Sequence, residues 1–162
     1  MRIEFILLAM LVLSACSQQS GDTQKLQEKV DSLQAKLNDA YKPGLGEFMT
    51  DIQLHHAKLW FAGTNKNWEM ADFEMHEIGE ALDDIKKYCT DRPEVKSIGV
   101  IDPALKSINE AIRQKDLQAF KKGFIELTTN CNNCHKSNQH GFNAITIPTA
   151  SPVVNQDFKP AK

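Results

Sequence analysis

The chain of 162 residues has few aromatics, few turn residues and little net charge. Aromatic residues make up 7% of the sequence, and there are only eight glycines and six prolines, too few for the many turns of an all-β sandwich. The formal net charge of -2 excludes both a strongly basic nucleic-acid binder and a disordered acidic tail. The composition therefore favours one helical domain of ordinary size.

Long hydrophobic runs are also lacking. The longest, from Phe5 to Leu13, is about nine residues, whereas a transmembrane helix needs roughly 20. Arg2 precedes this run and small residues follow it, which predicts a secretory signal over residues 1–15.

The small residues end in Leu13-Ser14-Ala15-Cys16, which resembles the lipobox of bacterial lipoproteins. The resemblance implies cleavage before Cys16, lipidation of Cys16 and attachment to a bacterial membrane through the lipid. Ser17 in the next position is similar to lipoproteins that are sent onward to the outer membrane. An ordinary signal with a chance cysteine is the alternative. We expect a periplasmic location.

Residues 16–43 are expected to carry the anchor, a small polar tether from Ser17 to Thr23, and a helical stalk. The stalk is predicted from a heptad stripe of four apolar residues, Leu26, Val30, Leu33 and Leu37. The stripe covers little more than two heptads, so a single stalk helix and a self-associating coiled coil both remain open. Pro43 ends the pattern.

Four amphipathic segments follow, and they predict an all-α domain over residues 44–140. The first covers residues 45–63, the second ends near Tyr88, and the third and fourth begin after Asp102 and Asp116. Asn65-Lys66-Asn67, Asp102 and Asp116 offer helix N-caps. Short links between four such helices predict an antiparallel four-helix bundle. The carboxylates of the second helix, Glu74 and Glu77 among them, read as a solvated face that could dock a basic redox partner.

The last segment, residues 141–162, contains Pro148, Pro152 and Pro160 and cannot be a continuous helix. Its apolar residues predict an extended tail packed on the bundle.

The chemistry is concentrated in Cys131-Asn132-Asn133-Cys134-His135, a C-x-x-C-H motif typical of covalent haem attachment. On a helix the two thiols lie about one turn apart, where they can form thioethers with one porphyrin, and His135 lies on the same apolar stripe as an axial ligand. A thioredoxin-like pair would need a preceding strand, and a zinc site would need His140 as a cramped fourth ligand. One covalent haem c is therefore the expected cofactor.

A C-x-x-C-H on the last helix of a four-helix bundle resembles the class II c-type cytochromes, the group of cytochrome c prime and its methionine-ligated relatives. The resemblance covers residues 44–140 and assigns the thioethers to Cys131 and Cys134 and the proximal ligand to His135. Class I cytochromes supply a methionine downstream of the motif, but no methionine follows Met75 here. The stalk, the long tail and the residues after His135 depart from the family pattern.

The ligand opposite His135 is expected from the first helix. Met49 lies about five residues, or roughly 7.5 Å, from the start of that helix, a height that matches His135 near the end of the last helix. His56, about 10.5 Å further along the same face, is the alternative. Phe48, Trp60, Phe120, Phe124 and Leu127 are expected to make the pocket dry.

One-electron transfer to redox partner proteins is the expected function, without enzymatic turnover, because no acid–base pair, activated nucleophile or phosphate loop is apparent. A gas-binding or sensing protein with an open sixth position is the alternative. Cys89 is left without a partner and reads as a buried small residue, with a disulfide across a dimer as the other interpretation.

Overall fold

The computed structural model describes residues 21–39 and 43–161, and its internal contacts divide the chain into two units between residues 42 and 43. The predicted signal, the lipidation site Cys16, and Ser17–Ser20 of the tether lie outside the described residues. Within those two ranges all regular structure is helical and there is no strand, so the all-α prediction is confirmed.

The described part of the N-terminal unit is one helix over residues 21–39. The four apolar residues of the heptad stripe are all exposed: Leu26 (64%), Val30 (49%), Leu33 (65%) and Leu37 (62%). Gly21 to Thr23, expected as tether, are helical, and this part of the prediction is wrong. Gln24 and Lys25 are good helix formers.

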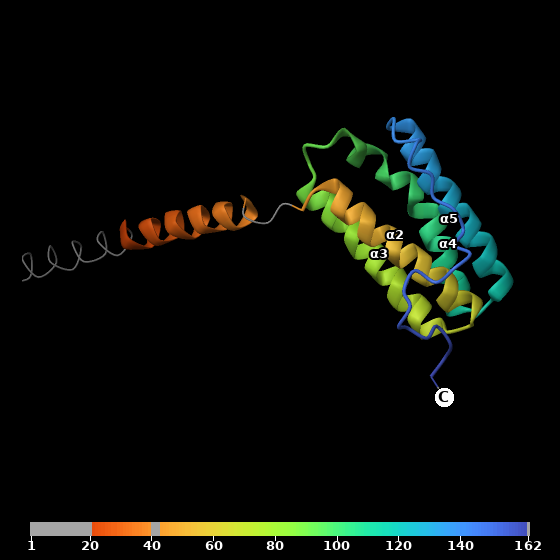
Figure 1. Cartoon of the computed structure of the whole chain (residues 1–162). Coiled ribbons are helices and arrows are strands. Elements are labelled where there is room, and N and C mark those ends of the chain that lie inside the picture. The colour runs from red at the N-terminus through yellow and green to blue at the C-terminus, as the bar shows by residue number, and fades with distance from the viewer. Residues whose placement is uncertain (1–20, 40–42, 162) are drawn as a thin grey trace, which may run out of the picture. The chain divides into compact units, whose positions relative to one another are not determined.

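The second unit contains α2 (Leu45–Thr64), α3 (Trp68–Tyr88), the 3₁₀ helix η1 (Pro93–Ile101), α4 (Asp102–Arg113) and α5 (Leu117–Ser137) (Figure 1). Two predicted N-caps are confirmed. The Asn67 side chain accepts from the backbone N–H of Met70, and that of Asp116 accepts from Gln118 and Ala119. None of the described helices is both long enough and apolar enough to span a bilayer.

The segment before α4 differs from the sequence prediction. Asp102 is the first residue of α4 rather than its cap, because the chain enters α4 directly from η1. Val95, Ile98 and Ile101 recur every three residues, which matches the three residues per turn of a 3₁₀ helix. This spacing buries Ile98 and Ile101 on one side of the helix. No helix was predicted here from the sequence.

The helices share one apolar core. Helix α2 packs along α3 and α4 along α5, α3 also contacts α4 and α2 also contacts α5, while η1 packs on α5 and α4. Two glycines allow close approaches. A β-carbon at Gly63 of α2 would lie 2.1 Å from the Phe120 ring of α5, and one at Gly123 of α5 would lie 2.8 Å from Ile108 of α4.

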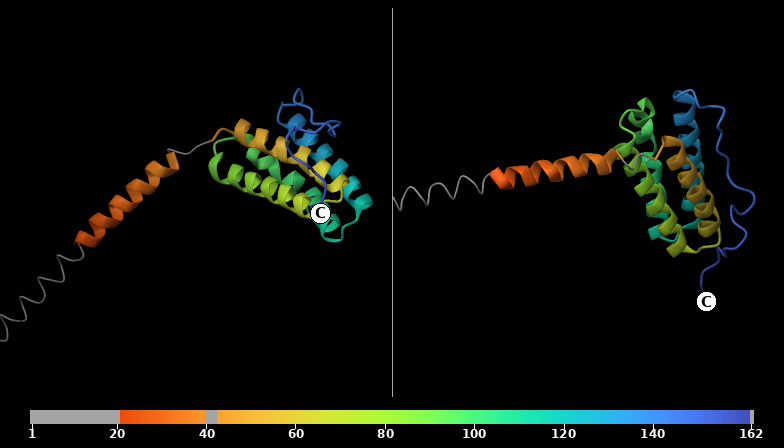
Figure 2. Two further views of the ribbon diagram at one scale, coloured as in Figure 1. Left: turned by 60° about the horizontal axis from the view of Figure 1, so that its bottom comes forward. Right: turned by 60° about the vertical axis from the view of Figure 1, so that its left-hand side comes forward.

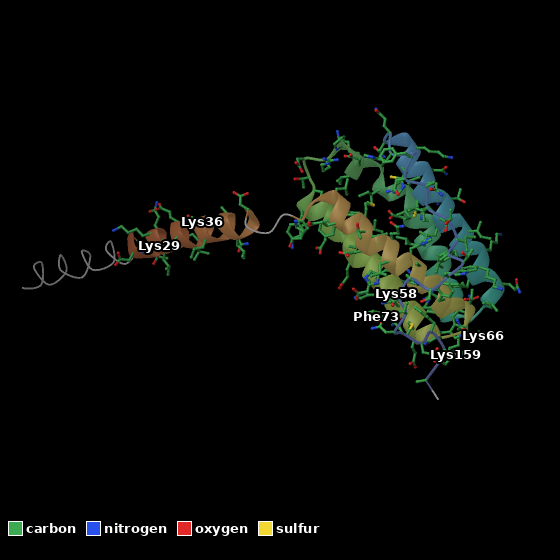
Figure 3. The ribbon with its side chains drawn as sticks, in the orientation of Figure 1. Lys29, Lys36, Lys58, Lys66, Phe73 and Lys159 are labelled. Carbon is green, nitrogen blue, oxygen red and sulfur yellow. The ribbon has the colours of Figure 1, made fainter. Side chains whose placement is uncertain are left out.

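Beyond α5 the chain reverses and runs back along the helices without regular structure (Figure 2). Gln139 adopts a left-handed φ of 64°, and the N–H of His140 bonds to the carbonyl of His135 at 2.7 Å, as in a Schellman helix end. At its far end the tail reaches the α2–α3 turn, where Phe158 is buried against Phe61 and the Asn67 amide donates to the Lys159 carbonyl. Figure 3 labels Lys66 and Lys159 at this end of the molecule.

The contact at Gly63 leads to a stability prediction. Gly63→Ala should lower the free energy of unfolding by about 1–3 kcal/mol, because the fully buried Phe120 ring must move although alanine is the better helix former. Gly79→Ala in α3 is the matched control: its β-carbon meets no atom within 4 Å, so helix propensity alone should raise stability by up to about 1 kcal/mol. Urea denaturation of the two variants measures both effects, and equal changes would contradict the close packing at Gly63.

Candidate functional site

A pocket lies at the end of the second unit where α2 begins and α5 ends. Its walls come from α2, α3, η1, α5 and the tail, and the empty space between them is about 560 Å³ including the open mouth. The lining is overwhelmingly apolar: Met49, Ile52, Gln53, His56, Leu82, Ile98, Val100, Ile101, Asn130, Cys131, Cys134, His135 and Ile145. All three residues of the C-x-x-C-H motif and both proposed sixth ligands thus meet in one cavity.

The two motif cysteines are free thiols on the α5 wall. Burial, with a smaller contribution from Cys134, raises the pKa of Cys131 to about 11, and burial also raises the pKa of Cys134. Both therefore stay protonated near neutral pH. A redox-active C-x-x-C needs a lowered thiol pKa, so this environment does not fit a thioredoxin-like pair.

His135 is held by one hydrogen bond to the tail. Its Nδ1 lies 2.7 Å from the carbonyl oxygen of Asn143, and because a carbonyl can only accept, Nδ1 carries the proton. The lone pair of the neutral ring is then on Nε2, which makes no hydrogen bond with any described residue. This is the arrangement found in metal-ligating histidines, whose second nitrogen is bonded to a carbonyl or carboxylate.

His56 is buried and already hydrogen-bonded. Its Nε2 lies 2.9 Å from the Thr128 hydroxyl, which itself donates to the Phe124 carbonyl at 2.8 Å. The hydroxyl oxygen must accept, so the proton of His56 is on Nε2. The ring also packs against Phe124 at 4.4 Å between centroids, and desolvation lowers the pKa of His56 to about 4. His56 is therefore a neutral, satisfied residue in the pocket wall.

Met49 differs from His56 in exposure and position. It is only partly buried and lines both the apolar pocket and an adjoining, more polar cavity of about 880 Å³, mouth included. The polar cavity contains Arg92, Glu94 and His140, and Glu94 accepts from Arg92 at 2.8 Å and pairs with His140 at 3.2 Å. A hydrogen bond from its own backbone N–H, followed by those to His140 and Arg92, lowers the pKa of Glu94 to about 2.

The residues that were expected to make the pocket dry lie elsewhere. Phe48, Trp60, Phe120, Phe124 and Leu127 belong to the core but do not line the cavity. For Phe120 the reason is distance along α5, since it precedes Cys131 by about three turns. The apolar lining comes instead from Ile98, Val100 and Ile101 of η1, Leu82 of α3, and Ile145 of the tail.

The expected solvated face of α3 is also wrong at Glu74, which is fully buried. Its carboxylate lies 2.6 Å from Nδ1 of His55 and 2.8 Å from Nζ of Lys58, both on α2. A buried carboxylate must be paired with a cation or a hydrogen-bond donor. In the sequence, the feature that indicates this pairing is the spacing of His55 and Lys58, which places both on one face of the facing helix. Glu77, which is 30% exposed and 4.0 Å from His55, lies at the edge of this network.

The structure also places the residues of the alternative zinc site and the remaining cysteine, Cys89. No group of three or more histidine, cysteine, aspartate or glutamate side chains in residues 21–39 and 43–161 is placed to bind a metal ion. His140, the suggested fourth zinc ligand, is paired with Glu94. Cys89 is buried at the end of α3, with its sulfur 3.8 Å from the Pro43 carbonyl.

Comparison with known proteins gives no relative. The chain matches no family model, no curated protein and no solved structure.

The buried histidine predicts a pH dependence of stability. The pKa of His56 is about 4 in the folded chain and 6.5 in the unfolded chain. The unfolded chain therefore binds a proton more readily, so the stability of the folded chain is unaffected by this residue above pH 6.5 and falls as the pH decreases from 6.5 toward 4. The loss over this window should be about 3 kcal/mol in the free energy of unfolding. In His56→Gln, whose amide can still donate to Thr128, this part of the pH dependence should disappear. Denaturant titrations at several pH values test this, and parallel profiles for the two proteins would contradict it.

Proposed function

We propose that this chain is a monohaem c-type cytochrome that transfers single electrons. The observation that supports this best is the placing of Cys131, Cys134 and His135 on one wall of an apolar pocket, with Nδ1 of His135 bonded to Asn143 and Nε2 unbonded among the described residues. Two free thiols and one available imidazole nitrogen are the groups that covalent haem attachment requires. The cofactor is one haem c.

We further infer that the second unit is an antiparallel four-helix bundle of the class II cytochrome type. The support is that α2, α3, α4 and α5 pack in the closed order α2–α3–α4–α5–α2, with short turns joining α2 to α3 and α4 to α5 and with η1 joining α3 to α4. The motif lies in the last turns of the last helix, as the resemblance implies. The 3₁₀ helix and the tail then supply pocket walls in addition to the bundle.

A bound haem supplies an iron that cycles between two oxidation states. The chain's own residues have three tasks. Cys131 and Cys134 fix the porphyrin, His135 presents a nitrogen whose orientation is set by the tail, and the apolar walls exclude water, which adjusts the reduction potential. Electron transfer rather than substrate turnover is the activity that this set of groups supports.

Met49 is the better candidate for the sixth ligand. Ligation by Nε2 of His56 would require breaking its bond to Thr128 and leaving a buried hydroxyl without a donor, at a cost of about 1–3 kcal/mol. The thioether of Met49 makes no such bond and lines the pocket from α2, across from α5. If neither residue binds the iron, the sixth position is open and gas binding becomes the function.

The location follows from the sequence. The lipobox resemblance at Cys16 supports a lipid-anchored protein at the periplasmic face of a bacterial membrane, with the outer membrane favoured. The helix over residues 21–39 serves as the stalk, and its exposed stripe leaves self-association open. The partners are redox proteins, and no nucleic acid is expected.

The first test is covalent haem attachment. The full chain, exported in a bacterium that matures c-type cytochromes, should show a Soret band that resists extraction by acidified acetone. Cys131→Ser with Cys134→Ser should abolish the retained haem because both thioethers are lost. Cys89→Ser is the matched control and should keep it, since Cys89 lies outside the pocket. A wild-type chain without a Soret band would refute the proposal.

The second test identifies the sixth ligand. The reduced wild-type protein should be low-spin and indifferent to carbon monoxide, whereas Met49→Ala should become high-spin and bind it. His56→Gln should leave the low-spin spectrum unchanged. Loss of the low-spin form in His56→Gln alone would assign the ligand to His56, and a wild-type protein that is high-spin and binds carbon monoxide would favour the gas-binding function.

A further inference from the structure

The tail is attached to the motif at two points. His135 donates from Nδ1 to the carbonyl of Asn143, and Asn132, the residue after the first motif cysteine, bonds to Ile145. Ile145 itself lines both the apolar pocket and the polar cavity. The tail is therefore part of the site wall and is joined to the same turns of α5 that carry Cys131 and Cys134.

Two hydrogen bonds join the Asn132 side chain to the tail. The Asn132 amide nitrogen donates to the Ile145 carbonyl at 2.8 Å, and the Ile145 backbone N–H donates to the Asn132 amide oxygen at 2.8 Å. The Asn132 side chain thus pairs with both the backbone N–H and the backbone C=O of Ile145, as a residue of a neighbouring antiparallel strand would. Such a pair fixes the tail in register as well as in distance.

Ile145 is only two residues from Asn143, about 7 Å of extended chain. Fixing the backbone at Ile145 therefore restricts where the Asn143 carbonyl can lie. On its other side Asn143 is fixed by its own N–H, which donates to the His140 carbonyl at 2.9 Å. The carbonyl that accepts the hydrogen bond from His135 is therefore held in place by contacts on both sides along the chain.

We propose that Asn132 is a positioning residue for the haem ligand: by binding Ile145, it holds the Asn143 carbonyl against Nδ1 of His135, so that Nε2 would remain free to bind the haem iron. This rests on the proposed function. The hydrogen bond at Nδ1 makes Nε2 a stronger donor to the iron and stabilises the oxidised state. Asn132 acts through the tail, without contact to the iron.

The first experiment measures hydrogen exchange in the tail and at the His135 ring, using the full chain as purified. Asn132→Ala should lower the protection of the Ile145 amide against hydrogen exchange by about tenfold or more, since both hydrogen bonds are lost. At about pH 8, where an ordinary imidazole is neutral, the Nδ1 proton of His135 should also lose its protection in nitrogen-resolved NMR. Neither readout requires that the chain carries haem.

The second experiment measures the reduction potential of the haem-bearing protein. In Asn132→Ala the potential should rise, because a histidine without its Nδ1 partner donates less to the oxidised iron. Asn133→Ala is the matched control: Asn133 lies in the same motif, is exposed, and its side chain makes no hydrogen bond to the described residues. It should change neither the potential nor the exchange rates.

Asn132→Asp is a second variant of the same shape, for use if Asn132→Ala does not fold. The carboxylate can still accept from the Ile145 N–H but cannot donate to its carbonyl, so the changes should be smaller and in the same direction. An unchanged Ile145 exchange rate, or faster exchange with an unchanged His135 signal, would overturn the inference. A chain without haem would refute the proposed function, while the exchange and NMR data would still decide the role of Asn132.

Discussion

The apolar face of α5 is the constraint on which the rest of the structure depends. Its first half, with Phe120, Phe124 and Leu127, is fully buried in the core, and its last turns carry Cys131, Cys134 and His135 into the pocket. Because the same stripe continues through both halves, packing of the core fixes the rotation of the motif. The direction in which the motif residues point is thus set by contacts three turns away.

Those contacts are close because small residues permit them. Phe120 occupies the space beside Gly63, and Ile108 the space beside Gly123, so that α5 lies tightly against both α2 and α4. Three polar side chains that this packing encloses have partners. Thr128 of α5 accepts from His56, and Glu74 of α3 binds His55 and Lys58 of α2. The apolar pocket lies where α5 ends, and there η1 and the tail complete its walls.

Much of the fold could be predicted from the sequence. The spacing of apolar residues located α2, α3 and α5 to within a few residues, and Asn67 and Asp116 marked two helix starts, because capping depends on local backbone geometry. Two features could not be read this way. The 3₁₀ helix before Asp102 was not predicted because its period of three is not that of an α-helix, and Glu74 was predicted to be solvated because its two cations are on another helix.

For the site, the sequence by itself determined the chemical groups: two cysteines one turn apart, the following histidine, and two candidates on the first helix. The tertiary structure decided where they lie and what they contact. It placed all five in one cavity, bound His56 to Thr128 while leaving Met49 unbonded, and brought the tail to His135 and Asn132. The physical reason is that a motif depends on spacing along one helix, whereas walls and hydrogen-bond partners come from segments distant in sequence, whose meeting depends on the packing of the whole core.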